Sequence, residues 1–167
     1  MASGAAMAKT TLEAMANDFL ALKRIAVAGV SADARRSAAA AIYRRLKSSG
    51  HEVFGLNPSL QSFDGDPCYP DVTSIPGGVD GVVIVTRPEA TEKIVRQCGE
   101  VGVRRVWMHE SSARTSSVSD EALAFCRSAG IAAIPGGCPM MFGANVDFGH
   151  RCMRWLLRLP AGRLAEG

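Results

Sequence analysis

The 167-residue chain lacks any uncharged apolar run of the length that a membrane span needs, which is about 18 residues or more. Its N-terminal stretch also lacks the apolar segment of a secretory signal peptide. Its five cysteines form no Cys-x-x-Cys pair and are odd in number, which argues against a disulfide framework and fits reduced thiols. We therefore expect a cytoplasmic protein with no membrane partner.

The chain also lacks a strong excess of positive or negative residues, and it has few aromatic residues. The chain has 19 basic and 16 acidic residues, a net charge of +3, and 6% aromatic residues. A nucleic-acid binder usually gathers basic residues on one face with aromatics between them, whereas here they are scattered. Nucleic acid is therefore not expected as a partner. The remaining composition, 47% apolar and 21% charged, is that of a globular domain.

Short apolar runs alternate with longer segments of helical periodicity, a pattern that predicts βαβ units. Strands are expected at 25–30, 51–56, 81–85, 103–108 and 131–134. Helices are expected at 11–22, from about 34 to 49, from Pro88 to the closing Gly102, and from the capping signal at 117–120 to Gly130. Parallel strands with right-handed crossovers then give a Rossmann-like three-layer α/β/α fold with a mostly parallel five-stranded sheet.

No domain boundary interrupts this pattern. We expect an N-terminal extension or helix over 1–20, a single domain over 21–160 and a tail over 161–167. Residues 59–78 are rich in Pro, Gly and Asp and should form a long connection with at most a short helix or strand.

A last helix is predicted over 146–159 and belongs to the same domain. One helical stripe holds its apolar residues, namely Phe148, Cys152, Trp155, Leu156 and Leu159. We expect this helix to pack on the sheet. A membrane-surface or partner-binding helix, including one that pairs with a second copy in a homodimer, is the alternative.

Glycines and polar residues gather where the predicted strands end. The ends read Gly29-Val30-Ser31, Asn57-Pro58, Thr86-Arg87-Pro88, Met108-His109-Glu110 and Pro135-Gly136-Gly137-Cys138-Pro139. In an open parallel sheet the ligand crevice lies beyond the carboxyl ends of the strands. These ends are therefore the candidate site.

The first strand end has the features of a phosphate site. Gly29 allows close approach of the backbone, Ser31 offers a hydroxyl, and the following helix offers free N–H groups and a positive dipole end. Further candidates for phosphate contacts are Arg35, Arg36 and Ser37. A tight turn with solvated arginines is the alternative. A bulky residue in place of Gly29 should abolish nucleotide binding and leave the fold intact.

The fingerprint of a dinucleotide site is missing. Such a site has G-x-G-x-x-G after the first strand and an acidic residue at the end of the second. Here the loop has one glycine, and the second strand ends in Asn57-Pro58. An NAD(P)-dependent oxidoreductase on the same fold stays an alternative only.

Five short motifs in order and at similar spacing resemble a known family. They are Gly29-Val30-Ser31, Asn57-Pro58, the Val85–Glu89 segment, Trp107-Met108 and Gly137-Cys138-Pro139. They are similar to the stand-alone CoA-binding domain proteins and to the N-terminal CoA-binding domain of the succinyl-CoA synthetase alpha subunit. The likeness covers residues 21–142. It implies a Rossmann-like fold with coenzyme A as the ligand.

The resemblance also implies where each part of CoA lies. The phosphates would bind at residues 29–37, and the pantetheine arm would run toward Glu110 and Cys138. The nucleotide would contact Asn57 and Pro58 and, at the adenine, Thr86, Arg87 and Pro88.

Two departures from the family limit what can be carried over. Ser59 and Leu60 stand where family members often have a lysine, so one phosphate contact is not expected. The chain also has no counterpart of the synthetase's phosphohistidine domain or partner subunit, so synthetase activity is not implied.

We expect a CoA-binding or acyl-CoA-binding protein that serves as a binding or regulatory module, with no catalytic residue assigned. The alternatives are the oxidoreductase above and a protein-interaction module that uses the last helix.

A thiolate pair of Cys138 with His109 or His150 would need the two side chains to meet. We expect Cys138 to be a buried packing residue instead. A zinc site from Cys138, His150 and Cys152 would need a fourth ligand, so no metal site is expected.

Overall fold

The computed structural model describes residues 12–33, 37–111 and 115–143. In chain order the elements are α1 (Leu12–Leu20), β1 (Arg24–Ala28), α2 (Ala38–Ser48), β2 (Glu52–Leu56), β3 (Ser62–Phe63), β4 (Asp66–Tyr69), the short 3-10 helix η2 (Val72–Ser74), β5 (Gly81–Ile84), α3 (Pro88–Val101), β6 (Arg105–Met108), α4 (Asp120–Ala129), β7 (Ala132–Pro135) and the 3-10 helix η3 (Pro139–Met141). Within these ranges, none of the helices has the length and apolar character to cross a membrane.

The strands form one sheet in the order β3-β4-β2-β1-β5-β6-β7. Every neighbouring pair is parallel except β3 with β4. The Rossmann-like α/β fold is therefore confirmed, whereas the predicted count of five strands is wrong, because the described residues form seven.

The two additional strands come from the 59–78 connection, where the sequence analysis allowed at most one short element. Phe63 pairs with Asp66, so Asp64 and Gly65 form a two-residue hairpin turn. Both have positive φ, 50° for Asp64 and 84° for Gly65. Asp-Gly is a strong signal for such a turn, and it outweighs the low strand propensity of the surrounding residues.

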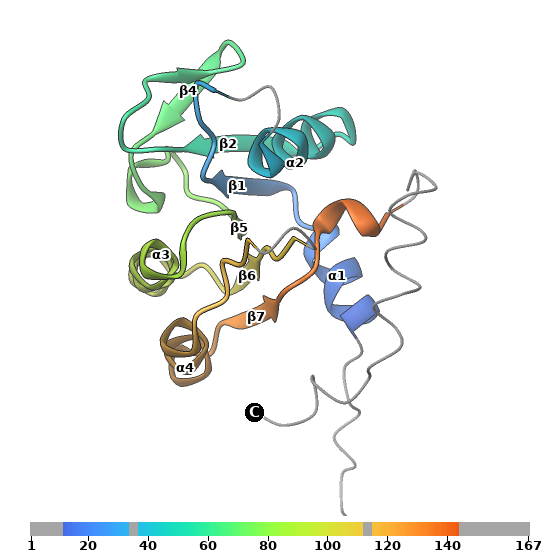
Figure 1. Ribbon diagram of the computed structural model, residues 1–167, viewed down its shortest axis with the longest axis vertical. Helices are drawn as coiled ribbons and strands as arrows, with labels where there is room; N and C mark the ends of the chain where they lie inside the picture. The colour runs from blue at the N-terminus through green and yellow to red at the C-terminus, as the bar shows by residue number, and fades with distance from the viewer. Residues whose placement is uncertain (1–11, 34–36, 112–114, 144–167) are drawn as a thin grey trace, which may run out of the picture.

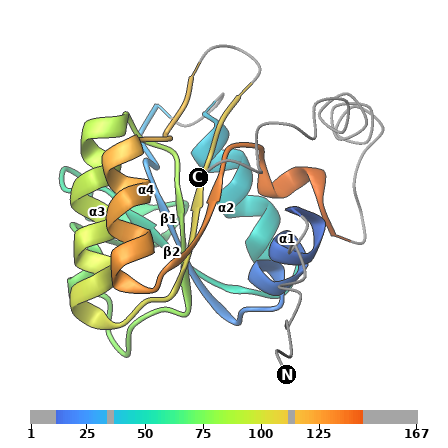
Figure 2. The same ribbon diagram turned by 90° about the horizontal axis from the view of Figure 1, so that it is seen from below.

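Helices cover both faces of the sheet, with α3 and α4 on one side and α1 and α2 on the other (Figures 1 and 2). Two buried clusters follow from this arrangement. In β1, Ile25 and Val27 face the α1–α2 cluster, while Ala26 and Ala28 face the α3–α4 cluster. The continuous apolar run of β1 is explained by this burial on both faces.

The helix ends follow the predicted caps. Pro88 lies in the first turn of α3, and Gly102 closes that helix with φ 79°. The Oγ of Ser119 accepts a hydrogen bond from the N–H of Ala122 and caps α4, and Gly130 closes it with φ 66°. These elements therefore begin and end where local chemistry predicts.

The start of α2 differs from the prediction of about residue 34. Ser37 has an extended backbone, and its Oγ accepts from the N–H of Ala40 at 3.1 Å, so the helix begins at Ala38. A serine cap ends the non-helical backbone at this point. Arg35, Arg36 and the helix expected over 146–159 lie outside the described residues.

Candidate functional site

The parallel strands β2, β1, β5, β6 and β7 end at one level. Their last residues pair in register, Leu56 with Ala28, Ala28 with Ile84, Ile84 with Met108 and Met108 with Pro135. The loops that follow therefore leave the sheet side by side, along what we call the carboxyl edge. The strand order reverses between β1 and β5, which is where the ligand crevice of such a sheet opens.

Gly29 lies at this reversal point. Its N–H donates to the carbonyl oxygen of Leu56 at 3.2 Å, and its φ is 99°. A Cβ atom at this position would lie 2.1 Å from the carbonyl oxygen of Val85. The expectation that a bulky residue leaves the fold intact is therefore wrong, because a backbone carbonyl of the neighbouring strand end occupies the space.

Asn57 joins the first two loops of the carboxyl edge. Its Nδ2 donates to the carbonyl of Val30 at 2.6 Å, and its Oδ1 accepts from the N–H of Ser59 at 2.7 Å. Its own N–H donates to the carbonyl of Tyr69 at 2.9 Å. The side-chain amide thus fixes the position of Val30, while Pro58 beside it is exposed.

Two serine hydroxyls flank the loop after β1. The Oγ of Ser31 accepts from the N–H of Asp33 at 3.2 Å, and the Oγ of Ser37 caps α2 through Ala40. A hydroxyl that accepts a hydrogen bond still has its own proton to donate. Both serines, which are half-buried, are therefore suited to an acceptor such as a phosphate oxygen.

The loop after β5 is held by residues that the sequence analysis did not assign to the site. The backbone N–H of Thr86 donates to the Oγ of Ser117 at 2.9 Å, and the hydroxyls of Thr86 and Thr91 lie 3.2 Å apart. Ser117 and Thr91 are buried. Ser117 was considered only as part of a helix cap, and no local pattern relates it to Thr86. Arg87, at the N-cap of α3, is exposed.

The loop after β7 is fixed by backbone bonds and by one indole. The N–H of Gly136 donates to the carbonyl of Met108 at 2.9 Å, and the N–H of Glu110 donates to that of Gly137 at 3.1 Å. The buried Nε1 of Trp107 donates to the carbonyl of Gly136 at 3.1 Å. The predicted residues Glu110 and Cys138 therefore belong to one rigid corner of the carboxyl edge.

Cys138 and His109 are both buried, 7% and 5% exposed. Burial raises the pKa of the Cys138 thiol and lowers the pKa of His109. Both shifts favour the neutral forms, whereas an activated nucleophile needs a thiolate beside a cationic imidazole. The packing interpretation of Cys138 is therefore favoured. The described residues contain no cluster of three metal-ligating side chains, and His150 and Cys152 lie outside them.

The arrangement as a whole offers hydroxyl donors, a glycine-rich backbone and a helix N-terminus. These groups suit a phosphorylated ligand that needs many weak polar contacts, and CoA fits this description.

Comparison with known proteins identifies the family of the chain. The family model of the CoA binding domain matches residues 23–144. The chain belongs to this family.

Curated relatives of this CoA-binding domain include two ligases. It is 36% identical over 62 residues to acetate–CoA ligase [ADP-forming] I of Archaeoglobus fulgidus, covering 37% of the chain and 9% of the ligase. It is 31% identical over 93 residues to the alpha subunit of acetate–CoA ligase [ADP-forming] II of Pyrococcus furiosus, covering 55% of the chain and 20% of the subunit. The match thus spans a small part of each relative.

Solved structures support the same fold over a larger share of the chain. A hypothetical protein from Pyrococcus horikoshii OT3 superposes with a TM-score of 0.70 at 27% identity, covering 78% of this chain and 87% of that one. The CoA-binding domain therefore has structural relatives of about its own extent as well as relatives that are much longer.

Proposed function

We propose that this CoA-binding domain binds CoA or an acyl-CoA at the carboxyl edge and serves as a binding or regulatory module. The observation that carries the proposal is the in-register row of strand ends, with Gly29 at the reversal point, in a chain that belongs to this family. Ligands of such sheets bind at this edge.

In this proposal the phosphates bind at residues 29–37, where Ser31 and Ser37 have protons to donate and α2 begins. The adenine lies near Thr86, Arg87 and Pro88, and the nucleotide passes Pro58. Asn57 contributes mainly by holding the Val30 carbonyl. The pantetheine arm extends toward Glu110 and Cys138.

A binding role is favoured over a thiol-based reaction because burial raises the pKa of Cys138. The ligase reaction of the relatives is left out of the proposal, since the matched region is at most 20% of the two ligase chains described above. The described cysteines are free thiols, which fits a reducing compartment, so we place the protein in the cytoplasm.

The first test is isothermal titration of the reduced protein with CoA, acetyl-CoA, dephospho-CoA and NAD⁺ in parallel. We expect CoA to bind and dephospho-CoA to bind more weakly, because the 3′-phosphate adds charge-assisted contacts.

Ser31→Ala should weaken CoA binding by about 2- to 10-fold, the effect of one lost hydrogen bond. The control is Ser128→Ala on α4, whose hydroxyl bonds its own helix at the Phe125 carbonyl and which should bind CoA like the natural protein.

Binding of NAD⁺ without binding of CoA would replace the proposal by the oxidoreductase alternative. Absence of binding by all four compounds would reject a nucleotide-binding function and favour an interaction module. Equal CoA affinity of the Ser31→Ala variant and the natural protein would show that the phosphate loop is placed wrongly.

A further inference from the structure

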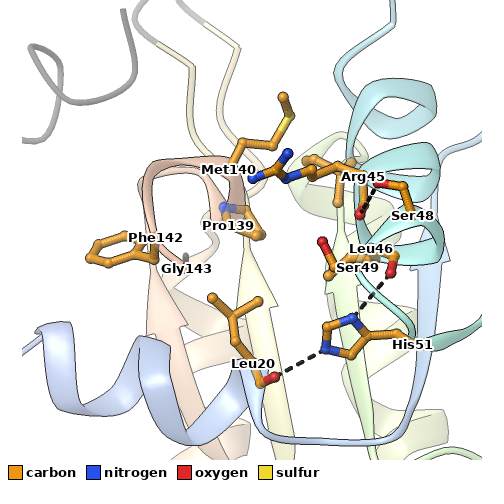
Figure 3. Close-up of a pocket in the computed structure, with 11 residues that line it drawn as sticks. Leu20, Arg45, Leu46, Ser48, Ser49, His51, Pro139, Met140, Phe142 and Gly143 are labelled. Atoms are coloured by element: carbon orange, nitrogen blue, oxygen red, sulfur yellow. Dashed lines mark hydrogen bonds between the residues drawn. The ribbon is translucent and has the colours of Figure 1, made fainter. Parts of the chain in front are cut away.

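A groove of about 460 Å³ lies on the face of the sheet that α1 and α2 cover, between α2, the end of α1 and η3 (Figure 3). Its apolar lining comes from all three elements. Leu20 belongs to α1, Ile42 and Leu46 to α2, and Met140 and Phe142 to η3 and its C-cap.

Four polar residues, Arg45, Ser48, Ser49 and His51, also line the groove, and the side chains of two of them bond within the protein. The ring nitrogens of His51 lie 3.1 Å and 3.0 Å from the carbonyl oxygens of Leu46 and Leu20. The Oγ of Ser48 donates to the carbonyl of Arg45 at 2.9 Å. With these two polar side chains bonded internally, the apolar residues contributed by the three elements offer a surface that suits apolar side chains.

The chain itself supplies such a surface at the right place. Gly143, the last described residue, lines the groove, and residues 144–167 follow it. Phe148 is the first residue of the apolar stripe predicted over 146–159. The segment from Gly143 to Phe148 can span up to about 17 Å, so the stripe can begin within the groove.

We propose that residues 146–159 form a helix that docks its apolar stripe into this groove. Phe148, Trp155 and Leu159 then contact the side chains contributed by α1, α2 and η3. Arg151, Arg154 and Arg158 face away from the stripe toward water. The docked helix completes the helical layer on this face and holds η3, which follows Cys138. This inference is independent of CoA binding.

Tryptophan quenching tests the contact in the full chain. The sequence has two tryptophans, and Trp107 is fully buried. If Trp155 is docked, acrylamide should quench both only weakly. Met140→Glu places a charge in the groove and should make Trp155 accessible while Trp107 stays protected. The matched control is Val101→Glu, at an exposed position on α3 across the sheet, which should leave quenching unchanged.

Alkylation of Cys152 gives a second readout by mass spectrometry. The other four cysteines are buried. The docked helix should slow modification of Cys152, and Met140→Glu should accelerate it by about tenfold or more, the factor for a loss of 1.4 kcal/mol in docking. Should Met140→Glu fail to fold by circular dichroism, Phe148→Glu tests the same contact from the segment itself.

Strong quenching of Trp155 fluorescence by acrylamide, together with rapid alkylation of Cys152 in the natural protein, would overturn the proposal. Protection that Met140→Glu and Phe148→Glu do not change would place the segment elsewhere and also overturn it. Protection that disappears on dilution, with a dimer seen by light scattering, would assign the groove to a second copy of the chain instead.

Discussion

Asn57 and Gly29 are the residues whose roles change most between sequence and structure. Both were expected to serve a ligand, and both have a structural task at the carboxyl edge. The amide of Asn57 holds the carbonyl of Val30, which is 27 residues away in the chain. Gly29 packs against the carbonyl of Val85. Residues of this kind shape a binding site by fixing its backbone.

Replacing Asn57 by Ala should lower the free energy of unfolding by about 1–3 kcal/mol. The Val30 carbonyl, which belongs to a buried residue, loses its side-chain donor, and the Ser59 N–H loses its acceptor. Urea denaturation measures the change, and Asn17→Ala on the exposed side of α1 is the control. A loss no larger than that of the control would show that these bonds do not stabilise the loops.

The sequence could predict that polar residues and glycines meet at the carboxyl edge, because strand ends are visible in the apolar pattern. It could not predict which of them bond to one another. The pairing of Thr86 with Ser117 depends on the register of two neighbouring strands and on the path of a loop between them. Such contacts come from tertiary structure and leave no periodic signal.

At the scale of elements, the hairpin β3–β4 is tied to α2 by charged and phenolic groups. The hydroxyl of Tyr43 donates to Asp66 at 2.7 Å, Lys47 also pairs with Asp66, and Arg44 bonds Asp64 at 2.6 Å. Burial, and then the hydrogen bond to Asp66, raise the pKa of Tyr43. The bonds to Lys47 and Tyr43 lower the pKa of Asp66.

Tyr43→Phe should lower the free energy of unfolding by about 1 kcal/mol, because the Asp66 carboxylate loses a hydrogen-bond donor. A double-mutant cycle with Asp66→Asn, followed by chemical denaturation near neutral pH, isolates the pair. The control is Tyr69→Phe, a half-buried tyrosine on β4. The coupling should weaken as pH falls through the lowered pKa of Asp66. A coupling near zero at neutral pH would contradict this account.

The β3–β4 hairpin also shows which kind of element the hydrophobic pattern of the sequence does not predict. The Asp-Gly turn was visible in the sequence, but the flanking segments are short and contain Pro67, which lowers strand propensity. Pro67 pairs with Ser62 of the edge strand β3, and the pairing of β4 with β2 involves Cys68 and Tyr69, so the proline lies outside the register with β2. The long helices α3 and α4, with clear caps and stripes, were predictable for the opposite reason.

At the scale of the whole molecule, both cores contain buried thiols. Cys68 and Cys138 belong to the α1–α2 cluster, and Cys98 and Cys126 belong to the α3–α4 cluster. Burial raises the pKa of Cys98 to about 12 and that of Cys126 to about 11. Folding therefore keeps these thiols protonated in a pH range where the unfolded chain ionises them.

We expect global stability to fall as pH rises above about 9, the pKa of a thiol in the unfolded chain. The stabilisation is fully present below that value and is lost toward the raised folded values. Each thiol contributes a slope of about 1.4 kcal/mol per pH unit at most. Urea unfolding between about pH 8 and pH 10 measures the slope. Cys98→Ala should flatten it.

Val95→Ala is the matched control for this slope, because Val95 is buried on the same helix and has no titrating group. It should lower stability at every pH by a similar amount and leave the slope unchanged. Equal slopes in the Cys98→Ala variant and the natural protein would mean that the thiol does not link folding to pH.

The contact between Gly29 and Val85 has a consequence for how members of this family are compared. A side chain at position 29 would collide with the backbone of the neighbouring strand end whether or not a ligand is present. A descendant that had abandoned CoA would therefore still be held to glycine at this position. Retention of that glycine is inherited with the fold, and loss of CoA binding would first show at Ser31, a half-buried residue whose hydroxyl accepts a local bond from the N–H of Asp33.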